Sequence, residues 1–228
     1  MRKAQILCYL VQTYRPVSFV KRMLMKSHQP GSSAGETPTC QRGWHRKKQP
    51  EQVRAALIQC AAELAARQGL TGVTVQAVSD AAGVTKGGFF HHFPHKQALL
   101  DAVFDAFMAE REQEIDALIA ADPHPGGRFT RAYITTAFEE MSQRGENIHI
   151  PLSLSMMASP ALCQRWNEWL AGRLQQHQLT DSHPLHEVAR LATDGAWLSG
   201  SLEVHSAVRD AQILKNHLLA LTRESEPS

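Results

Sequence analysis

The chain has 228 residues, of which 43% are hydrophobic, 20% charged and 7% aromatic, a composition that excludes a collagen-like or wholly disordered protein. No stretch reaches the roughly 18 consecutive apolar residues of a membrane-spanning helix, and the four cysteines show no CxxC spacing, which argues against a zinc ribbon or disulfide scaffold and favours a reducing compartment. The net charge of +2 is unevenly divided, with +9 in residues 1–48, +1 in residues 49–100 and −8 in residues 101–228, and this asymmetry points to a nucleic-acid or membrane contact at the N-terminal end.

The first 48 residues do not resemble a folded domain. The run over 30–43 is rich in Gly, Pro, Ser and Thr, which is typical of a linker. We therefore expect residues 1–48 to form a disordered basic N-terminal extension. One alternative is a translation start at Met23 or Met25. Another is a short basic amphipathic stretch within residues 1–26 that lies on a membrane, although we expect no membrane partner.

From Pro50 onward the spacing of apolar residues predicts helices. The first helix is expected to stop at Gly69, after which Thr74 and Thr85 have the side chains to cap two short helices, over 75–82 and 86–92. Longer or later helices are expected at about 95–121, 128–143, 150–158, 160–177, 184–206 and 210–222. No alternating strand pattern occurs, so we predict an all-α chain of about nine helices.

The stretch from Thr74 to Lys96 is the most informative part of the sequence. Its two short helices are separated by Gly83, which tolerates a positive φ, and Ser79 is small enough to let the helices approach. Apolar residues at Val78 and Phe89 have the spacing that holds the angle of a helix-turn-helix, whose second helix enters the DNA major groove. A generic helical hairpin is the alternative interpretation.

The segment Gly87-Gly-Phe-Phe-His-His-Phe-Pro-His-Lys96 matches the pattern Gly-x-[apolar]-[Tyr/Phe]-x-x-Phe-x-x-Lys, and on this basis the chain resembles the TetR/AcrR family of bacterial helix-turn-helix transcriptional regulators. The resemblance covers about residues 50–100 and extends weakly to about 222. It implies a three-helix DNA-binding domain over 49–96, joined to a larger helical domain over 97–228 that binds an effector and dimerises.

The resemblance implies DNA contacts by ten residues: Lys48, Thr74, Gln76, Thr85, Lys86, Gly87, Gly88, Phe90, His91 and Lys96. Lys86 is the expected reader of guanine O6 and N7, and His91 and Lys96 are expected at phosphates. Thr74 and Thr85 are expected to combine capping with phosphate or base contacts, and Gly87 lets the helix backbone approach the DNA. Phe89 and Phe93 are expected in the core.

Two positions depart from the family pattern. Phe90 stands where tyrosine is usual, so a phenolic hydrogen bond to phosphate is lost, and Gly88 stands where a hydroxyl or longer side chain is common. Compensation is expected from Gln76, from DNA shape or from the basic run 46–48 that includes Lys48. A solvated tail is the alternative interpretation of that run.

For the second half of the chain, the resemblance implies a homodimer through about residues 184–222 and, by its two-fold symmetry, a palindromic operator. A small apolar or aromatic effector is expected to release the DNA by a population shift. Its candidate lining residues are Phe107, Tyr133, Met156, Trp166 and Trp169. Plain hydrophobic core is the alternative for each.

The function predicted from the sequence is that of a ligand-responsive repressor in the bacterial cytoplasm, associated with the nucleoid. The rival is a helical small-molecule-binding protein or enzyme without DNA-binding activity. The sequence contains no glycine-rich phosphate loop, nucleophile elbow or HExxH motif, so we expect no enzyme and no cofactor. We expect no metal at His91, His92 and His95, because Pro94 interrupts the helix between them.

Overall fold

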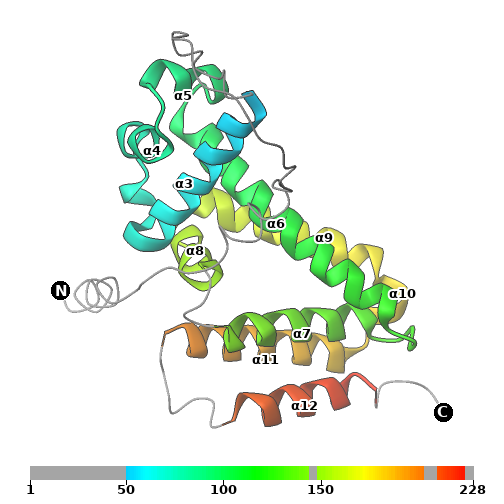
Figure 1. Ribbon diagram of the computed structural model, residues 1–228. Helices are drawn as coiled ribbons and strands as arrows, with labels where there is room; N and C mark the ends of the chain where they lie inside the picture. Colours follow the sequence, from blue (N-terminus) through cyan, green and yellow to red (C-terminus); the bar gives the residue numbers. More distant parts are fainter. Residues whose placement is uncertain (1–49, 144–147, 203–209, 224–228) are drawn as a thin grey trace, which may run out of the picture.

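The computed structural model describes residues 50–143, 148–202 and 210–223, and every regular element in these ranges is an α-helix (Figure 1). The all-α prediction is therefore confirmed for the described part of the chain. The helices are α3 (Pro50–Gly72), α4 (Val75–Ala82), α5 (Lys86–His92), α6 (Lys96–Ala121), α7 (Arg128–Ser142), α8 (His149–Met156), α9 (Pro160–Gln176), α10 (Gln178–Asp181), α11 (Pro184–Ser201) and α12 (Ala211–Leu221).

The local signals in the sequence correctly predicted the boundaries of the short helices. The Thr74 hydroxyl accepts a hydrogen bond from the Ala77 amide at 3.1 Å, and the Thr85 hydroxyl accepts one from the Gly88 amide at the same distance. Gly83 has φ +65° and ends α4 in the left-handed conformation. Each of these features depends on residues within four positions of one another, so the sequence alone could predict them.

Some features of the helices differ from the prediction. The first helix was expected to stop at Gly69, but α3 continues to Gly72, with a break at Gly69, where φ is +70°. The four-residue helix α10 was not expected, and it brings the number of helices in the described ranges to ten. It is held by tertiary contacts, because the buried carboxylate of Asp181 accepts hydrogen bonds from the amide and hydroxyl of Thr130 at 2.8 and 2.7 Å. Helix α11 ends at Ser201 rather than near 206, and residues 203–209 lie outside the described ranges.

The three helices α3, α4 and α5 share a hydrophobic core with α6 and α8. Phe89 and Phe93 are 0% and 3% exposed, as the sequence predicted for them. On α3 the residues turned inward include Ala61 and Ala65, which are fully buried and allow a second helix to come close. Helix α8 uses this space, and the Ser155 hydroxyl donates to the Ala65 carbonyl at 2.7 Å. The helix-turn-helix is thus fastened to the rest of the molecule.

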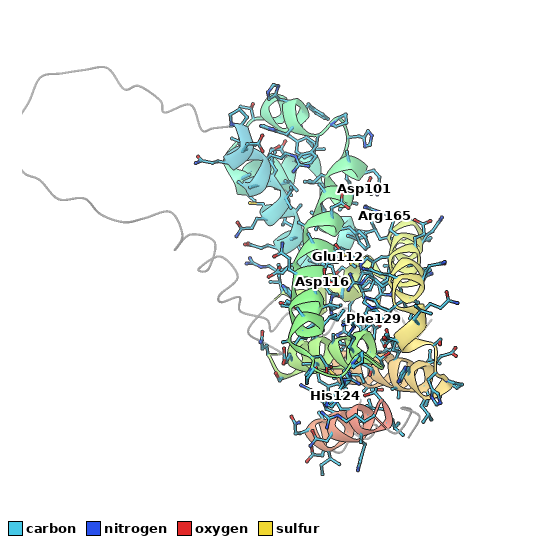
Figure 2. All side chains as sticks on the ribbon, turned by 90° about the vertical axis from the view of Figure 1, so that its right-hand side faces the viewer. Asp101, Glu112, Asp116, His124, Phe129 and Arg165 are labelled. Atoms are coloured by element: carbon cyan, nitrogen blue, oxygen red, sulfur yellow. The ribbon has the colours of Figure 1, made fainter. Side chains whose placement is uncertain are left out.

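Helix α6 runs from the helix-turn-helix to the opposite end of the molecule, with α9 alongside it (Figure 1). Long polar side chains connect the two helices. Arg165 pairs with Asp101 and Asp105, the Trp169 indole donates to Glu112 at 2.7 Å, and Arg173 pairs with Asp116 at 2.5 Å. Figure 2 shows Asp101, Glu112 and Asp116 spaced along α6 and Arg165 on the neighbouring helix.

Helices α7, α11 and α12 lie together at the end of the molecule farthest from α5 (Figure 1). Polar contacts link them: Arg131 on α7 donates to the hydroxyl of Thr222, the residue that ends α12, at 3.4 Å, and the Tyr133 hydroxyl donates to Asp194 on α11 at 2.5 Å. Burial raises the pKa of the Asp194 carboxyl, although the hydrogen bond from Tyr133 and the charge of Arg190 oppose this. Across the described residues, no helix combines the length and apolarity needed to cross a bilayer.

Gly83→Ala and Gly87→Ala test the local origin of the helix-turn-helix. An alanine at 83 must adopt the left-handed conformation, so we expect Gly83→Ala to lower the free energy of unfolding by about 1 kcal/mol. Gly87 lies within α5 and a Cβ there would meet nothing closer than the Thr85 hydroxyl at 3.8 Å, so Gly87→Ala should raise it by about 0.5–1 kcal/mol. Denaturant unfolding measures both, and shifts of the same sign would contradict this account.

Candidate nucleic-acid interface

Helix α5 has one buried side and one exposed side. Phe89 is buried against the core, whereas Lys86, Gly87 and His91 are exposed and the Phe90 ring is 52% exposed. The Phe90 ring meets Phe89 edge to face, with ring centroids 5.3 Å apart. The exposed side of α5 carries no acidic residue, so it is suited to an anionic partner.

The structure brings nine of the ten sequence-predicted DNA contacts to one end of the molecule. Thr74 and Gln76 are at the start of α4, Lys96 is at the start of α6, and the others occupy α5 or its cap. All nine are exposed or half-buried. Lys48 lies outside the described residues, as does the rest of the basic run 46–48.

The side chain of Gln76 is held along its own helix, because its amide group donates to the Asp80 carboxylate at 2.7 Å. This leaves the amide oxygen and the second N–H of Gln76 for another partner. Because the Asp80 carboxylate is negatively charged, a phosphate is bound less favourably beside Gln76 than beside the exposed ammonium of Lys86.

Lys96 has a structural role that the sequence did not indicate. Its ammonium donates to the Leu70 carbonyl at 2.8 Å and so connects the start of α6 to the end of α3, just after the break at Gly69. An ammonium has three donors, so two remain for a phosphate. No local pattern could have predicted this bond, because Leu70 and Lys96 are 26 positions apart.

Gly88 and Gly87 are not required by the packing of α5. A Cβ at Gly88 would sit 3.5 Å from the Thr85 hydroxyl and 3.6 Å from the nearest Val84 carbon, which is ordinary contact. Neither glycine has a positive φ. The two glycines therefore leave a bare backbone surface on α5 that any other residue would cover.

The five predicted effector-lining residues do not surround one pocket. Phe107 and Met156 belong to the core shared by α3, α6 and α8, whereas Tyr133 belongs to a second cluster around Phe129. Trp166 and Trp169 pack against both clusters. The polar atoms of Tyr133 and Trp169 are bound by Asp194 and Glu112. Helical periodicity places these residues on the apolar sides of their helices, but it could not indicate which helices face one another.

A cavity of about 160 Å³ lies between α3, α6 and α8, and Phe107 is the one predicted effector residue that lines it. The other apolar lining includes Ala55, Ile58, Ala106, Ile148 and Leu152. No sequence signal indicated that these residues of α3, α6 and α8 would line a cavity.

A metal site is not formed by the described residues, among which no three His, Cys, Asp or Glu side chains are grouped to hold an ion. In the predicted histidine cluster, the Nδ1 atom of His95 accepts a hydrogen bond from the Ala98 amide at 3.1 Å and caps α6. The rings of His91 and His92 meet edge to face, with centroids 5.1 Å apart.

Comparison with known proteins links both halves of the chain to one group. A model described as "Bacterial regulatory proteins, tetR family" matches residues 57–103, and one described as "Tetracyclin repressor-like, C-terminal domain" matches residues 127–223. The HTH-type transcriptional repressor KstR2 of Rhodococcus jostii (strain RHA1) is 30% identical over 86 residues, which are 38% of this chain and 42% of the repressor. The chain thus spans about two fifths of the length of this curated relative.

Solved structures share the fold. A candidate transcriptional regulator from Pseudomonas aeruginosa PAO1 is similar with a TM-score of 0.61 and 19% identity, covering 78% of this chain and 92% of that one. The multidrug binding protein EbrR, in complex with malachite green, is similar with a TM-score of 0.56 and 20% identity, covering 74% of this chain and 97% of its own.

Lys96→Met tests the structural role of Lys96. The substitution keeps the apolar stem but removes the bond to the Leu70 carbonyl, so we expect the free energy of unfolding to fall by about 1 kcal/mol. Lys86→Met, on the exposed side of α5, is the matched control and should change the free energy of unfolding by less than about 0.5 kcal/mol. Denaturant unfolding measures both, and equal stability of the two variants would show that the bond to Leu70 contributes nothing.

Proposed function

Because the chain belongs to the TetR family of bacterial transcriptional regulators, we propose that it is a ligand-responsive repressor that binds a palindromic DNA operator as a homodimer. The observation that carries this proposal is helix α5, whose buried side is anchored by Phe89 and whose exposed side offers Lys86 and His91 without an acidic neighbour on the helix. Such a regulator acts in the cytoplasm, at the nucleoid.

In this proposal α5 enters the major groove with its N-terminal residues leading. Lys86 donates to guanine O6 and N7, and Gly87 and Gly88 bring the helix backbone close to the base edges. Thr74 and the first amides of α4 face a phosphate, as do His91 and the two remaining donors of Lys96. Phe90 lacks a hydroxyl, so its ring makes apolar contact with a sugar or a thymine methyl group.

The dimer is proposed to form through the exposed apolar side of α11. Val188, Leu191, Leu198 and Leu202 are 52%, 64%, 39% and 42% exposed, and their spacing of three, seven and four positions places them on one side of the helix. Ile213 on α12 is also 55% exposed. A contiguous apolar surface of this kind commonly marks a protein–protein interface, and it lies at the end of the molecule opposite α5 (Figure 1).

A small effector completes the proposal, supported by family membership and by the cavity beside Phe107. The effector binds more tightly to a form in which α5 is wrongly placed for DNA, and so shifts the population away from the DNA-bound form.

The rival function, a helical binding protein or enzyme without DNA-binding activity, predicts that no duplex is bound even at low salt.

Lys86→Ala tests the reading role of α5. With duplex DNA from the protein's own promoter region, we expect the variant to lose about 10- to 100-fold in specific affinity, since a base contact contributes about 1–3 kcal/mol. Non-specific binding should fall less than about threefold at the same salt. Fluorescence anisotropy measures both, with Lys215→Ala on α12 as a control for removing a lysine far from α5.

Equal losses on specific and non-specific DNA would contradict the base-reading role of Lys86. Absence of binding by the unsubstituted protein at low salt would favour the rival function.

Leu191→Glu tests the dimer. A charge in the middle of the α11 surface should convert the dimer to a monomer, measured by sedimentation velocity at micromolar concentration. Leu179→Glu is the matched control, because Leu179 on α10 is 101% exposed and lies outside the proposed interface. A dimer that survives Leu191→Glu would place the interface elsewhere.

A further inference from the structure

The cavity between α3, α6 and α8 has the size of a single small ring. Its volume is about 160 Å³, close to the roughly 150 Å³ that accommodates a benzene-sized molecule and below the about 300 Å³ of pockets for larger ligands. Ala55 and Ala106 are exposed at its mouth, whereas Phe107 and Leu152 are buried deeper in. A planar ring can therefore enter from solvent and pack against Phe107.

The polar groups at this cavity favour a cation. Glu110 lines it with a side chain that is 40% exposed, and its ion-pair partner among the described residues is the His149 Nε2 atom at 3.6 Å, which is charged only if protonated. Gln59 is the remaining polar lining residue. A desolvated ammonium beside Glu110 would form a charge-assisted hydrogen bond.

Among the described residues around Glu110, there are more carboxylates than permanently charged cations. Arg111 pairs with Glu140 at 2.5 Å, and the other oxygen of Glu140, Oε1, is buried with no hydrogen-bond partner in the part of the chain that the structure describes. Glu114 also lies nearby. Burial raises the pKa of the Glu114 carboxyl; Arg111 opposes this shift, while Glu110 adds to it. A bound cation would offset this excess of negative charge.

We propose that this cavity is an effector site for a small aromatic amine, with the ring against Phe107 and the ammonium on the Glu110 carboxylate. The proposal rests on the proposed function for its regulatory consequence. The cavity wall is formed on one side by α3, which packs against the helix-turn-helix, and on the other by α6 and α8. A ligand held between them changes the position of α3, and with it α5, relative to the body, so that DNA affinity falls.

The experiment uses the full chain with benzylamine as the probe and toluene and benzoate as its neutral and anionic counterparts. Binding is followed by ligand-observed NMR and calorimetry. We expect benzylamine to bind at least tenfold more tightly than toluene, and benzoate not to bind. Glu110→Gln should remove the tenfold preference for benzylamine while leaving toluene binding unchanged. Glu168→Gln, at an exposed position of α9, is the matched control and should retain the preference for benzylamine.

Ala106→Leu provides the second variant. A larger side chain at the exposed mouth of the cavity should prevent the binding of both benzylamine and toluene without disturbing the core. Benzylamine binding that persists in Ala106→Leu, equal affinity for benzylamine and toluene, or no binding of any probe would each overturn the proposal.

The regulatory consequence is measured separately, as DNA affinity with and without saturating benzylamine. We expect at least a fivefold loss in the unsubstituted protein and none in Ala106→Leu. An unchanged DNA affinity with the cavity occupied would overturn the effector role. If the protein binds no DNA at all, the proposed function fails, whereas the NMR and calorimetric results still decide whether the cavity binds the amine.

Discussion

The close contact between α3 and α8 determines where the exposed helix α5 lies. Helix α5 has seven residues, two of them glycine, and a helix this short cannot maintain itself in water. It is held by the Thr85 cap and by Phe89, which is buried in the core that α3 contributes to. Helix α3 is in turn pressed against α8 through small residues such as Ala65. The orientation of α5 is therefore set by a helix more than 50 positions later in the chain.

Helix α6 joins this contact to the rest of the molecule. Its first residue, Lys96, is bonded to the end of α3, and farther along the ion pairs and the indole bond to α9 hold it in place. A displacement at the junction of α3, α6 and α8 cannot be absorbed locally, because each of the three helices is tied to a neighbour. Packed interfaces of this kind shift between discrete arrangements rather than deforming smoothly. The proposed amine site occupies that junction.

Sequence reasoning succeeded wherever the physical cause was local. Thr74 and Thr85 each stand just before a helical segment, and the hydroxyl of each caps that helix by accepting a hydrogen bond from the amide three residues later. Gly83 predicts a left-handed turn. It failed where the cause was distant: α10 exists because Asp181 reaches Thr130, 51 positions earlier. The candidate effector residues were predicted to line one pocket, but Tyr133 and Met156 lie in different clusters, and Trp166 and Trp169 are only half-buried.

By itself, the sequence determined that the chain is helical, where its short helices begin and end, and which segment resembles a DNA-reading helix-turn-helix. These features follow from periodicity, capping and glycine conformations, which act over a few residues. Only the tertiary structure decided which helices meet: α8 against α3, α9 along α6, and the cavity with Glu110 at its rim. The pattern of a helix specifies which of its sides is buried but not which neighbour covers it, because that choice depends on how all the apolar surfaces pack at once.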